Sequence, residues 1–316
     1  MLAIETNGLT KKFANGTAVD ALTMNVNRGE MFAMVGPDGA GKTTTIRMLC
    51  GIIPPNSGTA SVVGCDPVKE RKELVKKIGY LSQRFTLYGD LTVDENIEFF
   101  ARIHRVEEYA ARREELLDFT RLKDARKRLA DKLSGGMKQK LALACTLIHS
   151  PEIIFLDEPT TGVDPVARRD FWKILSNLLS QNITIFMTTP YLDEAERCTR
   201  VALMNHGRLM DLDTPANIKA KMRGEVYEIV CEPVREAYQF LKNRKELIEV
   251  QMYGDRLDVI LDSAPETIQP VLNILKTQGI NISSWRKIPV KLENVFISLM
   301  GSTAPVAPAV EEGAHA

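Results

Sequence analysis

A glycine-rich stretch near the start of the chain carries the residue types that most narrowly specify a ligand. It follows the pattern G-x-x-x-x-G-K-[ST] of a phosphate-binding loop. The loop and the residue after it are Gly36, Pro37, Asp38, Gly39, Ala40, Gly41, Lys42, Thr43 and Thr44. Glycines let the backbone bend so that several N–H groups converge on phosphate oxygens. Lys42 would then reach the β and γ phosphates, and Thr43 would offer a hydroxyl to Mg²⁺. The alternative is a glycine-rich turn without a ligand.

The flanking residues predict the elements that would position this loop. The apolar run 31–35 is short and bounded by turns, as a buried strand should be. A helix is expected from Thr44 onward, with Ile46 and Leu49 on its inner face. The positive N-terminal end of that helix would face the same anion as the loop.

Two carboxylates follow a second apolar run, 153–156. Asp157 and Glu158 would lie at the C-terminal edge of the sheet, where ligands of open α/β folds bind. Asp157 can hold Mg²⁺ indirectly, by orienting a group that binds the ion or through water, and Glu158 can orient and polarise a water that attacks the γ-phosphate. The alternative is that the two carboxylates cap the next helix.

Two further features admit both a structural and a ligand-binding interpretation. Ser134, Gly135 and Gly136 precede an apolar helix, 141–148, as an N-cap would. Together with the phosphate loop they predict a second anion-binding helix end, which would serve the nucleotide of another subunit. Phe13 stands before the turn 14–16 and could stack on adenine or pack locally.

Length and composition limit the possible classes. A chain of 316 residues predicts an α/β domain and a smaller one. Lys plus Arg and Asp plus Glu number 41 each, so the chain lacks the basic field of a nonspecific nucleic-acid binder, and no nucleic-acid partner is expected. Its five cysteines form no C-x-x-C pair, which argues against a zinc site and a disulfide framework and fits a reducing cytosol. No signal peptide and no apolar run near ~18 residues is found, so any membrane role would be through a partner.

Periodicity predicts the organisation of the chain. Apolar strands alternating with helices indicate an α/β fold with a largely parallel sheet over residues 1–220. Continuous helix is expected at about 92–148, as an inserted helical subdomain. The order β-α-β-β-α-β at 222–300 is that of a small ferredoxin-like α+β domain. The tail 302–316 is expected to be disordered.

These motifs together resemble the ATP-binding subunit of an ABC transporter. The loop 36–43 is similar to its Walker A, residues 133–137 to its signature, and 155–158 to its Walker B. Gln83, after a predicted strand at 78–82, matches the family's Q-loop glutamine, and 161–164 matches its D-loop. The resemblance covers residues 1–220 and implies a mixed, largely parallel P-loop ATPase fold.

The resemblance implies a division of roles and a set of partners. Lys42, Gln83 and Glu158 would be catalytic, Thr43, Gln83 and Asp157 would hold Mg²⁺, and Phe13 would stack on the adenine of ATP. Two such domains would pair head to tail, with the signature of each completing the ATP site of the other, and would drive separate membrane-spanning permease subunits. This places the chain in the cytoplasm, on the inner face of the cell membrane.

The wording of the motifs is most similar to that of drug-export and multidrug-efflux ATPases. The segments 191–196 and 292–296 also resemble that branch, in which the C-terminal domain is regulatory or supports the dimer. Two other classes remain open: a soluble ABC ATPase that acts on ribosomes or DNA, and a mainly regulatory ATP-binding subunit. The surface after Gln83, with Phe85, Leu87 and Tyr88, would either dock a membrane partner or form core.

Two positions depart from the family pattern. Pro190 occupies the place of the switch histidine, and its side chain can neither donate nor accept a hydrogen bond. The expectation is a slow or degenerate ATP site in a chain that pairs with a different ATPase domain; the alternative is a harmless exchange. Met137 stands where the family often has glutamine, so helix-end contacts would dominate at the signature.

Overall fold

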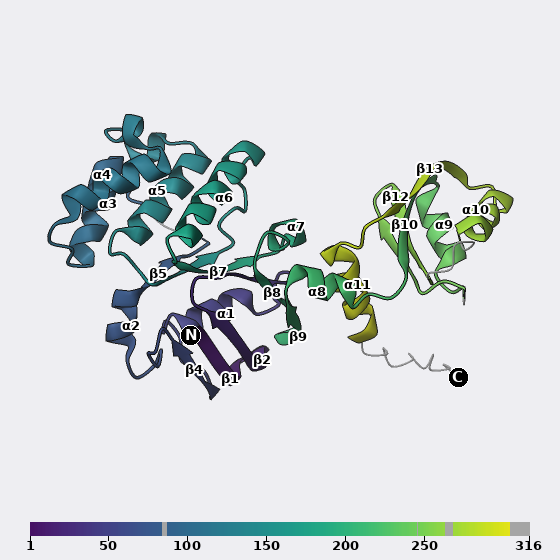
Figure 1. Ribbon diagram of the computed structural model, residues 1–316, viewed down its shortest axis with the longest axis horizontal. Helices are drawn as coiled ribbons and strands as arrows, with labels where there is room; N and C mark the ends of the chain where they lie inside the picture. Colours follow the sequence, from purple (N-terminus) through teal and green to yellow (C-terminus); the bar gives the residue numbers. More distant parts are fainter. Residues whose placement is uncertain (84–86, 245, 263–267, 304–316) are drawn as a thin grey trace, which may run out of the picture. The chain divides into compact units, whose positions relative to one another are not determined.

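The apolar runs that the sequence marks as buried strands form the middle of a six-stranded sheet (Figure 1). The strand order is β5-β6-β7-β3-β8-β9, and every neighbouring pair is parallel except β8 and β9. Every residue of β3 and β6 is buried, as expected for strands covered on both faces. The predicted α/β class with a largely parallel sheet is confirmed.

The computed structural model describes residues 1–83, 87–244, 246–262 and 268–303. It divides into two compact units, Met1–Pro215 and Ala216–Ala316. The domain limits predicted from the sequence remain predictions. The elements of the first unit are β1 Leu2–Phe13, β2 Gly16–Asn27, β3 Met31–Val35, α1 Lys42–Leu49, β4 Ser57–Val62, α2 Arg71–Lys77, β5 Ile78–Leu81, α3 Val93–Ile103, α4 Tyr109–Thr120, the 3₁₀ turns Lys123–Ala125 and Ala130–Lys132, α5 Gly135–Leu147, β6 Ile153–Asp157, α6 Pro165–Ser180, β7 Thr184–Thr189, α7 Leu192–Ala195, β8 Arg200–Asn205 and β9 Arg208–Asp213.

Helix α1 lies between the six-stranded sheet and a second, antiparallel sheet of order β2-β1-β4. One hydrophobic core joins the three layers, with Ile4 and Val62 from the small sheet, Ile46 from α1, and Phe32 and Phe155 from the large sheet. The rings of Phe32 and Phe186 are stacked with centroids 5.4 Å apart. This core fixes the N-terminal end of α1 beside the carboxyl ends of β3 and β6.

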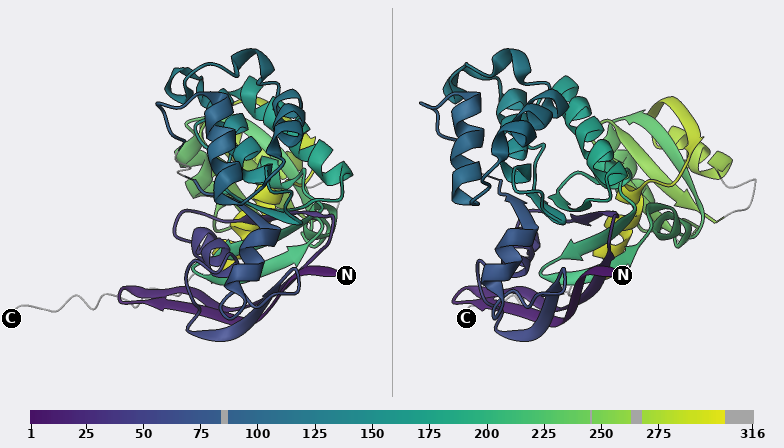
Figure 2. Two further views of the ribbon diagram at one scale, coloured as in Figure 1. Left: turned by 90° about the vertical axis from the view of Figure 1, so that its left-hand side faces the viewer. Right: turned by 60° about the vertical axis from the view of Figure 1, so that its left-hand side comes forward.

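The expectation of continuous helix at about 92–148 is wrong between Ile103 and Tyr109 and between Thr120 and Gly135. Helix α4 ends where Arg121 adopts a left-handed conformation (φ 57°), and α5 begins only after Ser134 caps it. Figure 2 shows α3, α4 and α5 gathered on one side of the unit.

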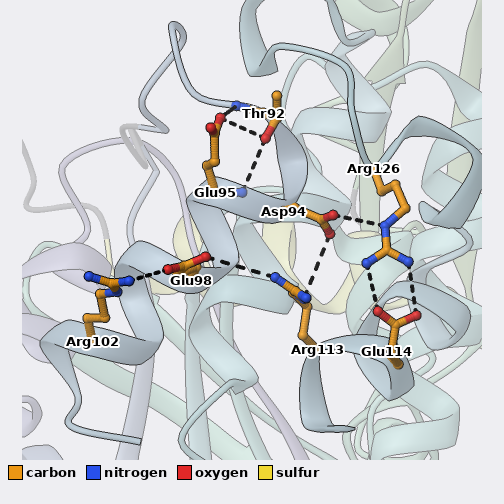
Figure 3. A network of polar contacts seen from close by, with 8 residues as sticks. All are labelled: Thr92, Asp94, Glu95, Glu98, Arg102, Arg113, Glu114 and Arg126. Carbon is orange, nitrogen blue, oxygen red and sulfur yellow. Dashed lines mark hydrogen bonds and ion pairs between the residues drawn. The ribbon is translucent and has the colours of Figure 1, made fainter. Parts of the chain in front are cut away.

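Charged side chains connect the segment between α4 and α5 to helices α3 and α4, as Figure 3 shows. Arg126 donates to Asp94 of α3 over 2.8 Å and to Glu114 of α4 over 2.7 and 3.1 Å. At the start of α3, Thr92 and Glu95 form a capping box. These contacts hold the segment that leads into Ser134 against α3 and α4.

The second unit contains a four-stranded antiparallel sheet of order β11-β12-β10-β13, which is the strand order of a ferredoxin-like fold. The predicted hairpin at Gly254 joins β11 and β12. The elements from Pro215 onward are α8 Pro215–Ala220, β10 Glu225–Glu232, α9 Val234–Leu241, β11 Glu249–Tyr253, β12 Arg256–Leu261, α10 Ile268–Thr277, β13 Asn281–Ile288 and α11 Leu292–Thr303.

The two faces of this small sheet differ in chemistry. Residues of α9 and α10, such as Leu241 and Leu275, complete an apolar core on one face. Toward α11 lies a buried polar network, in which Asn294 donates to Gln251 and to Asp258 over 2.9 Å each. Helix α11 is not foreseen from the sequence; it contains residues 302 and 303 of the predicted tail, and 304–316 lie outside the described residues. Among the described residues, no helix is both long and apolar enough to cross a membrane.

Candidate functional site

The phosphate-type loop connects β3 to α1, and its lysine is held by the loop itself. Lys42 Nζ donates to the backbone oxygens of Gly36 over 2.8 Å and of Pro37 over 3.1 Å. Its side chain is 4% exposed, so the ammonium lies inside the loop. The loop therefore presents a fixed positive charge at the start of α1, where the helix dipole adds to it.

Two glycines in the loop adopt backbone conformations that other residues disfavour. Gly39 has φ +80° and Gly41 has φ +99°. A Cβ at Gly41 would approach the backbone oxygen of Ala18 to 2.3 Å. The close approach of β2 to the loop thus depends on glycine at this position.

Asp157, at the end of β6, lies beside the first turn of α1. Its Oδ1 accepts hydrogen bonds from the hydroxyls of Thr43 over 3.0 Å and Thr188 over 2.6 Å. Thr188 lies opposite Asp157 in the register of β6 and β7. The carboxylate is therefore oriented by one hydroxyl from the loop and one from the neighbouring strand.

Glu158 directs its carboxylate toward the loop lysine. Oε1 lies 3.3 Å from Lys42 Nζ, and Oε2 accepts from Gln83 Nε2 over 3.1 Å. Its backbone is left-handed (φ 50°), which is strained for a residue with a Cβ, and its N–H donates to both oxygens of Thr188 over 3.1 Å. The strained turn places a buried carboxylate at a point where β5, β6 and the phosphate-type loop meet.

The negative charge of Asp157 affects two ionisable groups near it. Burial and the nearby charge of Asp157 raise the pKa of Tyr80 to about 12. Burial and, to a lesser extent, Asp157 also raise the pKa of the Cys50 thiol. The Asp157 carboxylate and the Thr43 hydroxyl, 3.0 Å apart, are two hard oxygen donors of the kind that Mg²⁺ prefers.

A cavity of about 590 Å³ opens above these residues. Its lining comes from β1, β2, the turn between them, the loop with the start of α1, and the residues that follow β5 and β6. The lining residues are Phe13, Asn15, Gly16, Thr17, Ala18, Asp38, Gly39, Ala40, Gly41, Lys42, Thr43, Thr44, Gln83 and Glu158. Phe13 is 48% exposed, and Lys11 Nζ lies 5.4 Å from its ring centroid. Phosphate donors at one end and an exposed aromatic ring at the other fit a nucleoside triphosphate.

The signature-like residues lie elsewhere. Ser134 caps α5 and accepts from Met137 N over 3.4 Å. Within the described residues, the lining of the cavity includes none of Ser134, Gly135 and Gly136, and it does not include Pro190. Pro190 follows β7, between Thr189 and Tyr191. The structure thus brings the loop, Gln83 and Glu158 together at one cavity, and the assignment of the signature-like residues to another nucleotide stays a prediction.

Three polar residues near the site were missed from the sequence: Thr188, Gln139 and Glu194. Gln139 on α5 donates to the backbone oxygen of Pro159 over 2.5 Å. Glu194, 1% exposed, accepts from the hydroxyls of Thr160 over 2.6 Å and Thr189 over 2.8 Å. The only sequence signal for Thr188 was its place at the end of a strand, two residues before the aberrant Pro190.

Comparison with known proteins gives a consistent family. The family model described as ABC transporter matches residues 19–161. The chain is 42% identical over 312 residues to the "Probable multidrug ABC transporter ATP-binding protein YbhF" of Escherichia coli K12, which covers 94% of this chain and 52% of YbhF. It therefore spans about half the length of this relative.

Two other relatives match over most of their own length. The "Daunorubicin/doxorubicin resistance ATP-binding protein DrrA" of Streptomyces peucetius is 33% identical, over 96% of this chain and 93% of DrrA. The "Nod factor export ATP-binding protein I" of Sinorhizobium fredii is 36% identical, over 95% of this chain and 86% of that protein.

Solved structures resemble about two thirds of this chain in fold. The "ATP binding subunit of ABC transporter" aligns with a TM-score of 0.63 and 28% identity, over 69% of this chain and 92% of that one. The dimeric ATP-binding cassette MJ0796 bound to ADP and Pi aligns with a TM-score of 0.60 and 25% identity, over 67% of this chain and 98% of that chain. Since relatives such as DrrA match nearly end to end, and since the loop, Gln83 and Glu158 line one cavity with Asp157 bonded to the loop at Thr43, the chain belongs to the ABC transporter ATP-binding proteins.

Proposed function

We propose that this chain binds ATP with Mg²⁺ in the cavity at the start of α1 and, as the ATP-binding subunit of an exporter, couples ATP to efflux of drugs or small hydrophobic compounds. The observation that carries the proposal is the convergence of Lys42, Gln83 and Glu158 on that cavity. The names of the relatives, which refer to multidrug transport, drug resistance and export, support the direction.

The residues of the site have separable roles in this proposal. Lys42 and the backbone N–H groups of 39–44 hold the β and γ phosphates, and Phe13 stacks on the adenine. Thr43 and Asp157, with Gln83, hold Mg²⁺, which supplies charge neutralisation on the phosphates. Glu158 orients the attacking water and accepts its proton.

Before a nucleotide binds, the Glu158 carboxylate is held by an ion pair with Lys42. The two groups lie 3.3 Å apart, and the triphosphate would compete with the carboxylate for that ammonium because both are anionic. ATP binding would therefore free the Glu158 carboxylate for water while Thr188 keeps its backbone in place over 3.1 Å.

Pro190 makes the turnover of this site slow. The family places a histidine here, and proline offers no side-chain group to contact the γ-phosphate. The chain would then work in a head-to-tail pair with a second ABC ATPase domain, to which it lends Ser134, Gly135 and Gly136. A different partner chain that carries the histidine fits this better than a second copy.

Membrane-spanning permease subunits would complete the transporter, and the chain would lie on the cytoplasmic side of the membrane. We place their docking surface after Gln83. Tyr88 is 43% exposed while its ring packs against Phe99 with centroids 4.4 Å apart, and Leu87 is partly buried beside it. Phe85, the third side chain of this predicted surface, lies outside the described residues. A Tyr88→Ala variant should lose assembly with permease subunits and keep ATP binding.

The proposal is tested by ATP binding and steady-state turnover of the purified chain and three variants. We expect Mg²⁺-dependent binding with weak turnover and no turnover in Glu158→Gln. Pro190→His should turn over at least about tenfold faster, since a positioned general acid–base group typically contributes ~10²–10⁴-fold. Lys42→Ala should lose binding itself.

Two results would contradict separate parts of this account. Brisk, Glu158-dependent hydrolysis by the unmodified chain would remove the degenerate-site hypothesis and leave the ATPase intact. A failure of the unmodified chain to bind MgATP more tightly than Lys42→Ala does would remove the ATP-binding function itself.

A further inference from the structure

The loop that follows Glu158 forms hydrogen bonds with side chains of two elements that are distant in the sequence, α5 and α7. Gln139 Nε2, on α5, donates to the backbone oxygen of Pro159 over 2.5 Å. On the other side, Thr160 Oγ1 donates to the buried carboxylate of Glu194 over 2.6 Å. The residue directly after Glu158 is therefore bonded to the helix that begins at the signature-like residues.

The start of α5 is also fixed to the start of α6. A Cβ at Gly136 would lie 2.4 Å from Ala167 Cβ, so the two helices touch at this glycine. Asp164 caps α6 by accepting from the N–H of Val166 over 3.1 Å and of Ala167 over 2.9 Å. The signature end of α5 therefore packs directly against the first turn of α6, which follows closely on the Glu158 loop.

The other end of this connection senses the cavity. Glu158 contacts Lys42 over 3.3 Å and Gln83 over 3.1 Å, and both of these side chains line the space assigned to phosphate. An anionic ligand competes with Glu158 for the buried ammonium, since charge pairs gain strength where water is excluded. A change in the partners of Glu158 reaches Pro159 through a single peptide unit.

We propose that Gln139 is a positioning residue that couples the nucleotide in this chain's own cavity to its signature residues, Ser134 to Gly136. The inference rests on the proposed function, in which the signature serves the nucleotide of a partner domain. Gln139 is not catalytic, because its contact is with the loop backbone and not with the phosphate-lining atoms. A slow ATP site could regulate its neighbour in this way without turning over.

Hydrogen–deuterium exchange of the intact chain tests the coupling at the signature itself. The backbone amides of residues 133–143 are followed with and without MgATP in the unmodified chain, in Gln139→Met and in Gln139→Lys. Methionine keeps the length of the side chain and removes its donor, whereas lysine restores a donor. Lys138→Met, one residue away, is the matched control.

We expect MgATP to change exchange at residues 134–140 of the unmodified chain by about fivefold, the size of a typical coupling. Gln139→Met should abolish most of this response, with Gln139→Lys regaining it and Lys138→Met retaining it. The affinity for MgATP should stay within about threefold in all four proteins, since removing one hydrogen bond outside the phosphate site leaves direct contacts intact.

Three outcomes would overturn the coupling. They are a response that persists in Gln139→Met, a response that Lys138→Met loses equally, and an unmodified chain that binds MgATP without any change at 134–140. The exchange is also measured at two protein concentrations, because a response that grows with concentration comes from pairing of chains and contradicts a route inside one chain. Loss of MgATP binding in every protein, by contrast, would refute the proposed function.

Discussion

His104 and His149 stack with their ring centroids 3.8 Å apart and their planes 1° from parallel. His104 follows α3, and His149 follows α5, where its Nε2 bonds to the backbone oxygen of Ile78 over 2.9 Å. The pair therefore joins the helical part of the first unit to the start of β5. We predict that His104→Phe, which keeps an aromatic ring and removes the titration, makes the first unit resistant to mild acid.

The size of the effect follows from the pKa. Burial, and then the charge of His149, lowers the pKa of His104 from 6.5 to about 4. Burial also lowers the pKa of His149. The folded state then binds fewer protons than the unfolded state, so the stability is full above pH ~6.5 and is lost as pH falls toward ~4. The difference for His104 corresponds to at most ~3 kcal/mol, and because its ring keeps some contact with water we expect ~1–2 kcal/mol.

Denaturant unfolding followed by tryptophan fluorescence measures this difference. The chain has two tryptophans, Trp172 and Trp285. In a Trp285→Phe background, the remaining Trp172, 5% exposed on α6, reports on the first unit. Parent and His104→Phe are compared from pH 8 to pH 4.5, and the free energy of unfolding of His104→Phe should rise by ~1–2 kcal/mol relative to that of the parent as pH falls. A gap that stays constant over this range would refute the reasoning.

Two further predictions concern backbone and buried charge. Gly41→Ala should weaken MgATP binding at least tenfold and lower thermal stability. Residue 41 has φ +99°, which is strained for alanine, and the added Cβ would lie 2.3 Å from the backbone oxygen of Ala18. Gly135→Ala, whose Cβ would meet nothing within 4 Å, is the matched control for stability. Asp258→Asn should stabilise the second unit, most strongly at high pH: burial raises the pKa of Asp258, so stability is lost as pH rises through that pKa. Trp285 fluorescence in a Trp172→Phe background would detect it, and a gain that is equal at pH 4 and pH 8 would contradict it.

The convergence of the site could be predicted because its members stand in fixed places relative to strands. The phosphate-type loop follows β3, and Asp157 and Glu158 end β6, so parallel strand order alone brings their carboxyl ends to one edge. Gln83 needed the family pattern, since a lone glutamine after a strand indicates nothing by itself.

The parts that could not be predicted depend on lateral neighbours. Thr188 reaches Asp157 only because β7 lies beside β6 in the register Asp157↔Thr188. Gln139 reaches Pro159 across 20 residues of chain, and no spacing rule marks that pair. Helix α11 is not predicted from the family resemblance, although Leu292, Val295 and Phe296, all buried, stand at helical spacing.

Contacts at the end of β7 also determine which properties can change when proline replaces the family's histidine at position 190. The end of β7 is held by the residues before the proline: Thr188 bonds to Asp157 over 2.6 Å, and Thr189 bonds to Glu194 over 2.8 Å. Neither contact requires a side chain at 190, so proline leaves the Asp157 carboxylate and the Glu158 backbone where they are. The expected defect is therefore confined to turnover, with folding and MgATP affinity preserved. A domain that binds ATP firmly and hydrolyses it slowly is also the kind of domain in which coupling through Gln139 would have time to act.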